Sequence, residues 1–176
     1  MRIEKEQAVA LVIDYQGKLV PVMHESEQLI HNSCILLKGL KALGVPMILT
    51  QQYTKGLGMT IELITEAAGT AEYTDKLSFT AYDCVKEKLW GKKFVIICGI
   101  ETHICVLQTV IDLKKAGFVP VLVTDCVSSR KAQDKKIAIK RAWDEGAIVT
   151  TYESLLFELL KVAGTETSKE IQRLIR

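Results

Sequence analysis

Residues 94–109 read FVIICGIETHICVLQT, an apolar run of seven residues followed by a polar turn and the start of an expected helix. A continuous, β-branched apolar run of this length is typical of a strand that is covered on both faces, as in a parallel sheet. Four more runs of this kind are expected to form strands, at residues 8–14, 45–50, 119–125 and 147–151. Helices are expected between these strands, at about 26–42, 103–116 and 131–145.

The joints between the expected helices and strands share one pattern. The segments KALGVP, KKAGFVP and WDEGAIV each place a glycine (Gly44, Gly117 and Gly146) shortly before the next strand. Glycine accepts the left-handed conformation that ends many helices. Strands that alternate with helices through right-handed crossovers build a doubly wound fold. We therefore predict an α/β, three-layer sandwich with a mostly parallel central sheet of five to six strands.

The length of 176 residues fits one domain with its own core. We expect residues 1–176 to form a single domain, in which residues 165–176 are a C-terminal helix or tail, packed on the body or on another subunit. Residues 52–80 are too long for a plain connection between a strand and a helix, and they carry both glycines of KGLG. We expect an irregular insert with a functional role there.

The composition narrows the class of protein. Apolar residues make up 48% and charged residues 25%, which is ordinary for a globular chain, and the net charge of +2 indicates neither a nucleic-acid nor a membrane partner. Five cysteines without a C-x-x-C pair argue against a disulfide framework or a zinc ribbon. No apolar run approaches a membrane span, and the run at 8–13 is too short for a signal peptide. We expect a cytoplasmic protein.

Three side chains could carry chemistry where open α/β sheets bind ligands, beyond the carboxyl ends of the strands. Asp14 ends the first strand, Lys76 lies in the insert, and Cys105 follows the strand FVIICGI at the start of a helix. Taken alone, Asp14 also fits a turn or cap, and Lys76 also fits a solvated side chain. The helix N-terminus favours a thiolate, so we expect the pKa of Cys105 to lie below its ordinary value.

The other cysteines and the histidines are weaker candidates. We expect Cys34 inside a helix and Cys98 in the middle of a strand, both as small buried hydrophobes, with Cys84 at a helix start and Cys126 just beyond a strand end. His103 stands two residues before the candidate nucleophile, and side chains two apart point away from each other on a helix. No H-x-x-x-H or D-x-H cluster appears, so no metal site is expected.

Four motifs occur in a specific order: LVIDYQ at 11–16, DKLSFTAY at 75–82, GIETHICVLQTVIDLKKAG at 99–117 and VLVTDCVSSR at 121–130. Over about residues 8–160 the chain resembles the isochorismatase-like cysteine hydrolase superfamily, and this resemblance implies the fold of that superfamily. QQYTKGLG at 51–58 and KEIQRLIR at 169–176 are similar to the branch of small isochorismatase-domain-containing proteins.

The resemblance implies a catalytic triad of Asp14, Lys76 and Cys105. In such a triad the thiolate attacks a carbonyl carbon, Asp14 relays protons, and Lys76 stabilises the ion pair and orients the carboxylate. The resemblance also implies a cis peptide bond between Ile100 and Glu101, with the backbone amides of Glu101 and Cys105 as an oxyanion hole.

Five further residues are expected to line the substrate pocket: Tyr53, Phe79, Tyr82, Thr102 and His103. The alternative interpretation is that they are ordinary core and turn residues. Nicotinamidases of this superfamily carry a D-x-H metal motif where this chain reads QQYTKG, so neither nicotinamide hydrolysis nor bound zinc is expected.

Amide chemistry is the leading interpretation. Isochorismatases act on an enol ether without a cysteine nucleophile, whereas this chain retains Cys105. We expect a hydrolase that cleaves a small amide or related C–N bond through a Cys105 thioester, without a cofactor. Two alternatives are a catalytically relic α/β interaction protein and a hydrolase of an ether or ester.

Partners are implied in part by the resemblance, which indicates a homo-oligomer, dimer or higher, acting on a small-molecule substrate. A role in nucleic-acid processing rests only on a basic run in one expected helix: Lys131, Lys135, Lys136, Lys140 and Arg141. Such a run is typical of a solvated helix face, so no nucleic acid is expected. Thiol redox chemistry at Cys105 lacks a neighbouring resolving cysteine.

Overall fold

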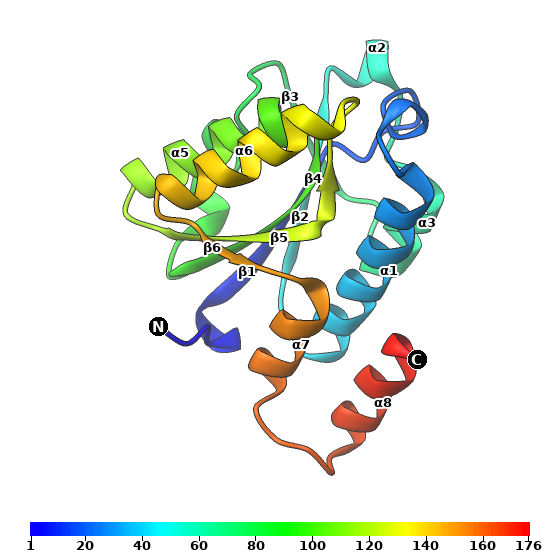
Figure 1. Cartoon of the computed structure of the whole chain (residues 1–176), viewed down its shortest axis with the longest axis vertical. Helices are drawn as coiled ribbons and strands as arrows, with labels where there is room; N and C mark the ends of the chain where they lie inside the picture. The colour runs from blue at the N-terminus through cyan, green and yellow to red at the C-terminus, as the bar shows by residue number, and fades with distance from the viewer.

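The computed structural model describes residues 1–176, whose six strands form one parallel sheet in the order β3-β2-β1-β4-β5-β6 (Figure 1). The strands are β1 (Ala8–Ile13), β2 (Met47–Gln52), β3 (Tyr73–Lys76), β4 (Phe94–Ile100), β5 (Val119–Ser128) and β6 (Ile148–Thr150). Every residue of β1 and β4 is buried, as their continuous apolar sequences require. The predicted α/β sandwich with a parallel sheet is confirmed.

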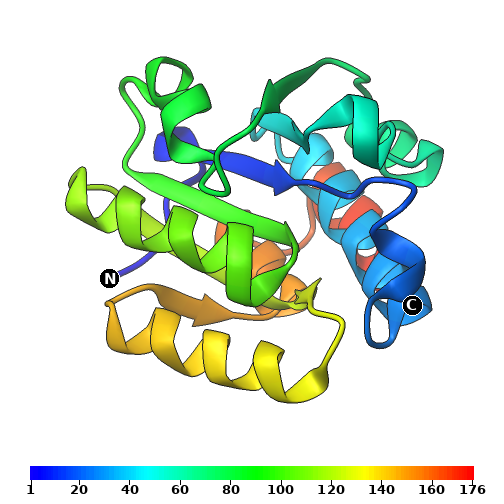
Figure 2. The ribbon, with the colours of Figure 1, turned by 90° about the horizontal axis from the view of Figure 1, so that it is seen from above.

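Eight helices connect or follow the strands: α1 (Ser26–Ala42), α2 (Thr54–Leu57), α3 (Glu62–Ala68), α4 (Tyr82–Val85), α5 (Leu107–Lys115), α6 (Ala132–Asp144), α7 (Tyr152–Leu160) and α8 (Glu166–Ile175). Four short helical segments complete the fold: η1 (Lys5–Gln7), η2 (Val20–Val22), η3 (Lys86–Leu89) and η4 (Thr102–Val106). Figures 1 and 2 show α5 and α6 on one side of the sheet, with α1, α7 and α8 on the other. None of these helices is both long and apolar enough to cross a membrane.

Two hydrophobic cores lie on opposite faces of the sheet. Successive residues of β1 alternate between them, so that Val12 packs in the core beneath α1 and α7, whereas Ile13 packs in the core beneath α5 and α6. At the C-terminus, α8 buries Ile171 against the first core and packs on α1 and α7. The sandwich is therefore closed by helices on both faces.

The structure corrects the sequence-based expectations in three places. Residues 52–80 are not irregular throughout, because they contain α2, α3 and the edge strand β3. Helix α7 was not among the expected helices. Cys126 lies within β5 rather than beyond its end, because a register irregularity opposite residues 97–99 of β4 lets β5 pair again as far as Ser128.

The strand order places a topological switch point between β1 and β4. The chain proceeds from β1 to β2 and β3 on one side, then crosses to β4, β5 and β6 on the other. In open α/β sheets, ligands bind beyond the carboxyl ends of the strands at such a switch point. Asp14 follows β1 and η4 follows β4 at this point, so the fold brings the expected acid and nucleophile to one place.

Candidate active site

A buried ion pair lies at the carboxyl end of the sheet. Lys76 Nζ lies 2.7 Å from Asp14 Oδ2, and neither side chain is more than 1% exposed. Asp14 follows β1 in the left-handed region (φ 55°), and its Oδ1 accepts a hydrogen bond from Thr50 Oγ1 at 2.8 Å. Lys76 is the last residue of β3, two strands away in the sheet. Folding therefore joins two residues that are separated along the chain by α1, β2 and most of the insert.

The Lys76 ammonium is held by oxygen atoms from two segments. It donates to Gln52 Oε1 at 2.6 Å, to the Phe79 carbonyl at 3.0 Å and to the Ser78 carbonyl at 3.3 Å. Gln52 in turn donates from Nε2 to the Leu77 carbonyl. Such acceptors compensate the loss of water around a buried cation. Lys76 is therefore a built part of the site and not a solvated side chain.

Sequence reasoning missed Gln52, Thr50 and Gln16 as site residues. Gln16 is completely buried; its Nε2 donates to the carbonyls of Gln52 (2.9 Å) and Gly58 (2.7 Å), and its Oε1 accepts from the Gln52 amide (2.7 Å). It thus ties the end of β1 to the insert. The only available signal for Gln16 and Gln52 was their position inside the LVIDYQ and QQYTKGLG motifs, whereas Thr50 lies in neither motif. Neutral amides and hydroxyls do not by themselves indicate chemistry.

Cys105 lies in η4, a single turn of π-helix that leads into α5, and it is 7% exposed. Its carbonyl accepts from Thr109 Oγ1 at 2.7 Å, and the same hydroxyl accepts from the Ala81 amide at 2.8 Å. This contact ties η4 to the segment that follows Lys76. The Asp14 carboxyl and the Lys76 ammonium both act on the Cys105 thiol, so the three residues meet at the switch point of the sheet.

The electrostatics of Cys105 differ from the expectation. Burial and, to a lesser extent, the negative charge of Asp14 raise the pKa of its thiol to about 12, although the Lys76 ammonium acts in the opposite direction. The expected lowering by a helix N-terminus is overturned, because the thiol is removed from water and faces a carboxylate. Cys105 therefore keeps its proton at neutral pH.

Asp14 is suited to receive that proton. Burial raises the pKa of its carboxyl above the ordinary value, while the charge and hydrogen bond of Lys76 oppose this rise. A carboxylate with a raised pKa is a stronger base than an ordinary one. The resting arrangement is a thiol beside a buried carboxylate–ammonium pair.

The two residues whose amides are the predicted oxyanion donors follow β4: Glu101 precedes η4, and Cys105 lies within it. The peptide bond between Ile100 and Glu101 is cis. The Glu101 carboxylate is nearly buried and accepts from the Arg130 backbone amide at 3.0 Å and from Arg130 Nε at 3.2 Å. Arg130 follows β5, so this pair fixes the turn to the neighbouring strand.

The five expected pocket residues are dispersed around this site. Tyr53 and Phe79 are about half exposed, and Tyr82 packs edge-on against Phe118 with ring centroids 6.4 Å apart. The histidine is turned toward two polar partners: His103 Nδ1 lies 2.9 Å from Ser129 Oγ, and Nε2 lies 4.0 Å from Asp134. Thr102 is completely buried, and its hydroxyl has no hydrogen-bond partner.

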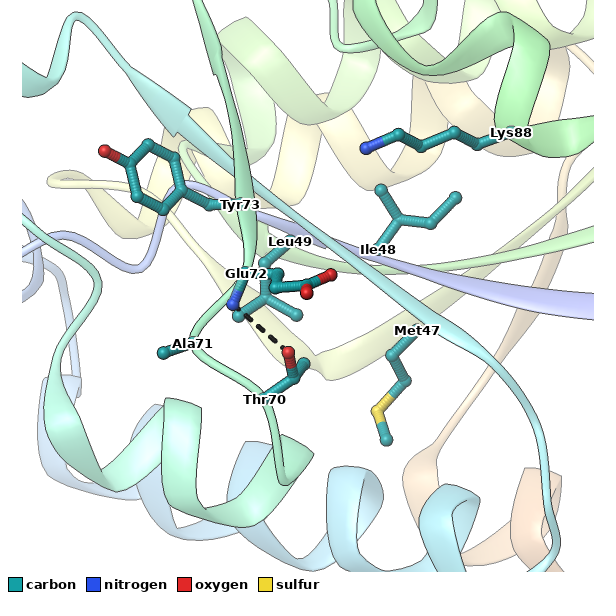
Figure 3. A pocket seen from close by; sticks show the side chains of 8 residues that line it. All are labelled: Met47, Ile48, Leu49, Thr70, Ala71, Glu72, Tyr73 and Lys88. Carbon is teal, nitrogen blue, oxygen red and sulfur yellow. Dashed lines mark hydrogen bonds between the residues drawn. The ribbon is translucent and has the colours of Figure 1, made fainter.

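Two sizeable cavities in the molecule do not contain the triad residues. One, of about 570 Å³, opens at the edge of the sheet where β3 begins, and Figure 3 shows its lining residues Met47, Ile48, Leu49, Thr70, Ala71, Glu72, Tyr73 and Lys88. Another of about 570 Å³ lies between α1 and the insert and includes Cys34. The candidate site is therefore identified by its buried ion pair and thiol and not by the volume of a cavity. No group of side chains is arranged to hold a metal ion.

Comparison with known proteins places this geometry in context. Residues 8–154 match the family described as Isochorismatase domain. Isochorismatase domain-containing protein 2A of Mus musculus is 33% identical, and the match covers 99% of this chain and 85% of that protein. Secreted isochorismatase effector Isc1 of Phytophthora sojae is also 33% identical, over 99% of this chain and 87% of that protein.

Solved structures give the same result at the level of the fold. The MAR1 ribonuclease of Caenorhabditis elegans superposes with a TM-score of 0.93 and 35% identity, covering 99% of this chain and 92% of that one. The YcaC protein of Escherichia coli, described as an octameric hydrolase of unknown specificity, superposes with a TM-score of 0.86 and 26% identity, covering 92% and 83%.

Proposed function

Because the chain belongs to the isochorismatase family, we propose that it is a cysteine hydrolase that cleaves a small amide or related C–N bond, with Asp14, Lys76 and Cys105 as its catalytic residues. The observation that carries the proposal is the buried Asp14–Lys76 pair, 2.7 Å apart, whose charges act on the Cys105 thiol at the switch point of the sheet. Burying an ion pair carries a desolvation penalty that lowers the stability of the fold. Its presence beside a thiol therefore favours a role in chemistry.

In the first half of the reaction, Cys105 Sγ attacks the carbonyl carbon of the substrate. The thiol proton passes to Asp14 as the sulfur–carbon bond forms. The carbonyl oxygen becomes an oxyanion that accepts hydrogen bonds from the backbone amides of Glu101 and Cys105. Collapse of this intermediate breaks the C–N bond. Asp14 returns its proton to the leaving nitrogen, which departs as ammonia or an amine, and a Cys105 thioester remains.

In the second half, water attacks the thioester carbonyl. Asp14 accepts a proton from the water, the carbon–sulfur bond breaks, and the proton is transferred to Cys105 Sγ, which restores the thiol and releases a carboxylic acid. Lys76 keeps its charge throughout and holds the Asp14 carboxylate through its Oδ2 contact. The sum is one amide and one water consumed, one acid and one amine formed.

A panel of small amides tests this proposal. Release of ammonia or amine is measured for the wild type and for Cys105→Ala, with Cys98→Ala as a matched control because Cys98 is a buried thiol in the middle of β4. We expect turnover in the wild type and in Cys98→Ala, and none in Cys105→Ala. Hydrolysis confined to esters or enol ethers would favour the alternative chemistry, and a complete lack of turnover across all three classes would favour a relic site.

Ribonuclease activity is a second candidate, favoured by the 35% identity to a protein named MAR1 ribonuclease. The basic run of α6 offers limited support, because Lys140 lies 2.8 Å from Asp144 and Arg141 lies 3.7 Å from Glu145, so both charges are compensated within the helix. Incubation with single-stranded and folded RNA decides between the candidates. Cleavage that persists in Cys105→Ala would establish a nuclease site distinct from the triad.

Assembly and location are further proposals. The octameric state described for YcaC of E. coli supports a homo-oligomer, which light scattering tests against the 19.6 kDa of one chain. The five free cysteines support a reducing compartment such as the cytoplasm, although one relative is named a secreted effector. Cell fractionation of the tagged chain tests the location.

A further inference from the structure

A tight turn just before β4 presents Trp90 to solvent. Its central residues are Trp90 (φ −57°, ψ 136°) and Gly91 (φ 75°). The Lys92 amide closes the turn by donating to the Leu89 carbonyl at 3.0 Å. These angles are those of a type II turn, whose second central residue needs the freedom of glycine. Trp90 is 90% exposed, more than any other large apolar side chain, whereas Leu89 is completely buried. The backbone therefore holds the indole away from the core.

The turn is anchored on both sides, so the exposure of Trp90 belongs to the fold. On one side, Leu89 packs in the core beneath α5 and α6. On the other side, the Lys93 amide donates to the Gln7 carbonyl at 2.9 Å and joins the turn to the start of β1. Single exposed apolar residues are common on protein surfaces. A tryptophan that is fixed in this way, however, can bind a partner at little cost in conformational freedom.

Positive charge without acidic partners accompanies the indole. Residues 86–93 read KEKLWGKK, and four lysines less one glutamate give this segment a net charge of +3, against +2 for the whole chain. None of the ion pairs in the structure involves its lysines, Lys86, Lys88, Lys92 and Lys93. The small net charge of the chain thus conceals a local basic surface, which we call the lysine–tryptophan turn (residues 86–93).

The lysine–tryptophan turn and the candidate active site lie at opposite edges of the sheet. The turn precedes β4, whereas Glu101 and Cys105 follow β4. Because β4 has seven residues and a strand rises about 3.3 Å per residue, its two ends are about 20 Å apart. A surface bound to the turn therefore leaves the carboxyl end of the sheet open to water and to small molecules.

The chemistry of the turn matches the surface of a membrane that contains anionic lipids. An indole has a large apolar body and one N–H donor, and tryptophan is accordingly enriched where a membrane meets water. Lysine side chains lay their methylene stems along apolar surface and keep their charge in water. Each lysine near an anionic leaflet strengthens binding about fivefold without any specific geometry. An exposed indole among unpaired lysines fits such a surface.

Other partners fit the turn less well. Single-stranded nucleic acid stacks its bases on several aromatic side chains along a groove, but the neighbouring Phe94 is only 1% exposed. A peptide needs a groove, and the nearby cavity of Figure 3 is lined by Lys88 but not by Trp90. A symmetric contact with a second copy would place two segments of charge +3 against each other.

We propose that the lysine–tryptophan turn docks the protein on membrane surfaces that contain anionic lipids, with the Trp90 indole in the interfacial layer and the four lysines among the headgroups. The contact is peripheral and reversible, because one tryptophan and a charge of +3 bind far more weakly than a spanning helix inserts. It does not depend on Cys105, so a protein without hydrolase activity would dock in the same way.

Co-sedimentation of the full chain with lipid vesicles tests this proposal. Vesicles of phosphatidylcholine alone are compared, at low salt, with vesicles in which about a third of the lipid is phosphatidylserine. We expect binding to the anionic vesicles only, and its loss at high salt. Trp90→Ala should lower the partition coefficient at least about tenfold. Lys86→Gln combined with Lys93→Gln should lower it about 25-fold, from about fivefold per lysine.

The basic end of α6 provides matched controls. Trp143 is 63% exposed and also follows two cations in the sequence. These cations are paired within the helix, since Lys140 lies 2.8 Å from Asp144 and Arg141 lies 3.7 Å from Glu145. Trp143→Ala, and Lys140→Gln combined with Arg141→Gln, should bind vesicles as the wild type does. The two double variants change the net charge of the chain equally, so only a local role of the turn makes them differ.

Fluorescence shows whether the indole itself enters the membrane. The chain has two tryptophans, so Trp143→Phe leaves Trp90 as the only one. We expect its emission to shift to shorter wavelength, and to be quenched by brominated lipid, in anionic vesicles. Bound protein with unchanged Trp90 emission would overturn the proposal. A lack of binding to anionic vesicles, or an equal loss of binding in Trp143→Ala, would also overturn it.

Two further results would assign the turn to a different partner and would likewise overturn the proposal. Quenching of Trp90 by single-stranded RNA, without binding to vesicles, would identify a nucleic-acid surface. Dissociation of an oligomer by Trp90→Ala in the absence of lipid, measured by light scattering, would identify a contact with a second copy of the chain.

Discussion

Replacing Asp14 by asparagine should make Cys105 easier to alkylate while it abolishes turnover. Burial and the Asp14 charge raise the pKa of the Cys105 thiol to about 12, and Lys76 opposes them. At neutral pH the thiol is therefore almost entirely protonated. The Asp14→Asn substitution removes the like charge but keeps the size of the side chain, and loss of such a neighbour lowers a pKa by about 1 to 3 units.

This shift corresponds to a gain of about 10- to 1,000-fold in thiolate, and the alkylation rate should rise toward that range. Lys76→Met should act in the opposite direction, because it removes the only positive charge that favours the thiolate. Both variants should lose hydrolysis, since one lacks the proton carrier and the other lacks the group that holds it. The opposite signs in alkylation distinguish these electrostatic effects from general damage to the site.

The assay is the rate of iodoacetamide labelling of Cys105 at several pH values, read by peptide mass spectrometry. Asp144→Asn serves as a control, because Asp144 is an exposed acid at the end of α6. Breaking a buried ion pair costs about 3 to 5 kcal/mol, so urea unfolding must first establish that each variant is folded. Slower labelling in Asp14→Asn would refute the reasoning, because it would mean that Asp14 already holds Cys105 as a thiolate at rest.

Three further outcomes follow from the same structure. Gln52→Met removes an acceptor 2.6 Å from Lys76 Nζ; it should lower the unfolding free energy by about 1 to 3 kcal/mol and slow turnover, as urea titration and the amide assay would measure. Gly99→Ala should cost at least about 3 kcal/mol or prevent folding, because its φ is +133° and the new Cβ would lie 2.2 Å from the Ile13 carbonyl oxygen; stability equal to wild type would contradict this contact. Because the pKa of Cys105 is raised from 9.0 to about 12 in the folded state, its contribution to the free energy of unfolding should be fully present below pH 9.0. This contribution should be lost as the pH rises toward about 12, by up to about 1.4 kcal/mol per pH unit. The same loss in Cys105→Ala would exclude Cys105 as its source.

The sequence was sufficient for most of the fold, because buried parallel strands are long apolar runs. β1, β4 and β5 were visible as such, and helix α1 was found with its observed bounds. β3 was missed because its four residues, YTDK, lie at the edge of the sheet and are mostly exposed, so no apolar run marks them. Tertiary pairing with β2, and not local sequence, makes this segment a strand.

The acid, the cation and the thiol of the site were found from their motifs, but their surroundings were not. The pKa expectation for Cys105 was wrong because a local rule about helix ends was applied to a thiol whose burial and acidic neighbour dominate. Gln52 and Gln16 carry no charge, and their importance appears only when the insert folds back on β1. Arg130 was present in the quoted VLVTDCVSSR motif, yet its contact with Glu101 spans 29 positions and could not be inferred from spacing.

Nucleophilic catalysis by Cys105 can be measured directly with p-nitrophenyl acetate, an activated acyl donor that does not depend on the natural substrate. We expect a burst of about one equivalent of p-nitrophenolate per active site, with an acetyl group on the peptide that contains Cys105, followed by slower turnover as water releases it. Cys105→Ala should show neither the burst nor the adduct. Release without a burst, an acetyl group found only on other residues, or the same burst in Cys105→Ala would contradict a thioester mechanism at this site.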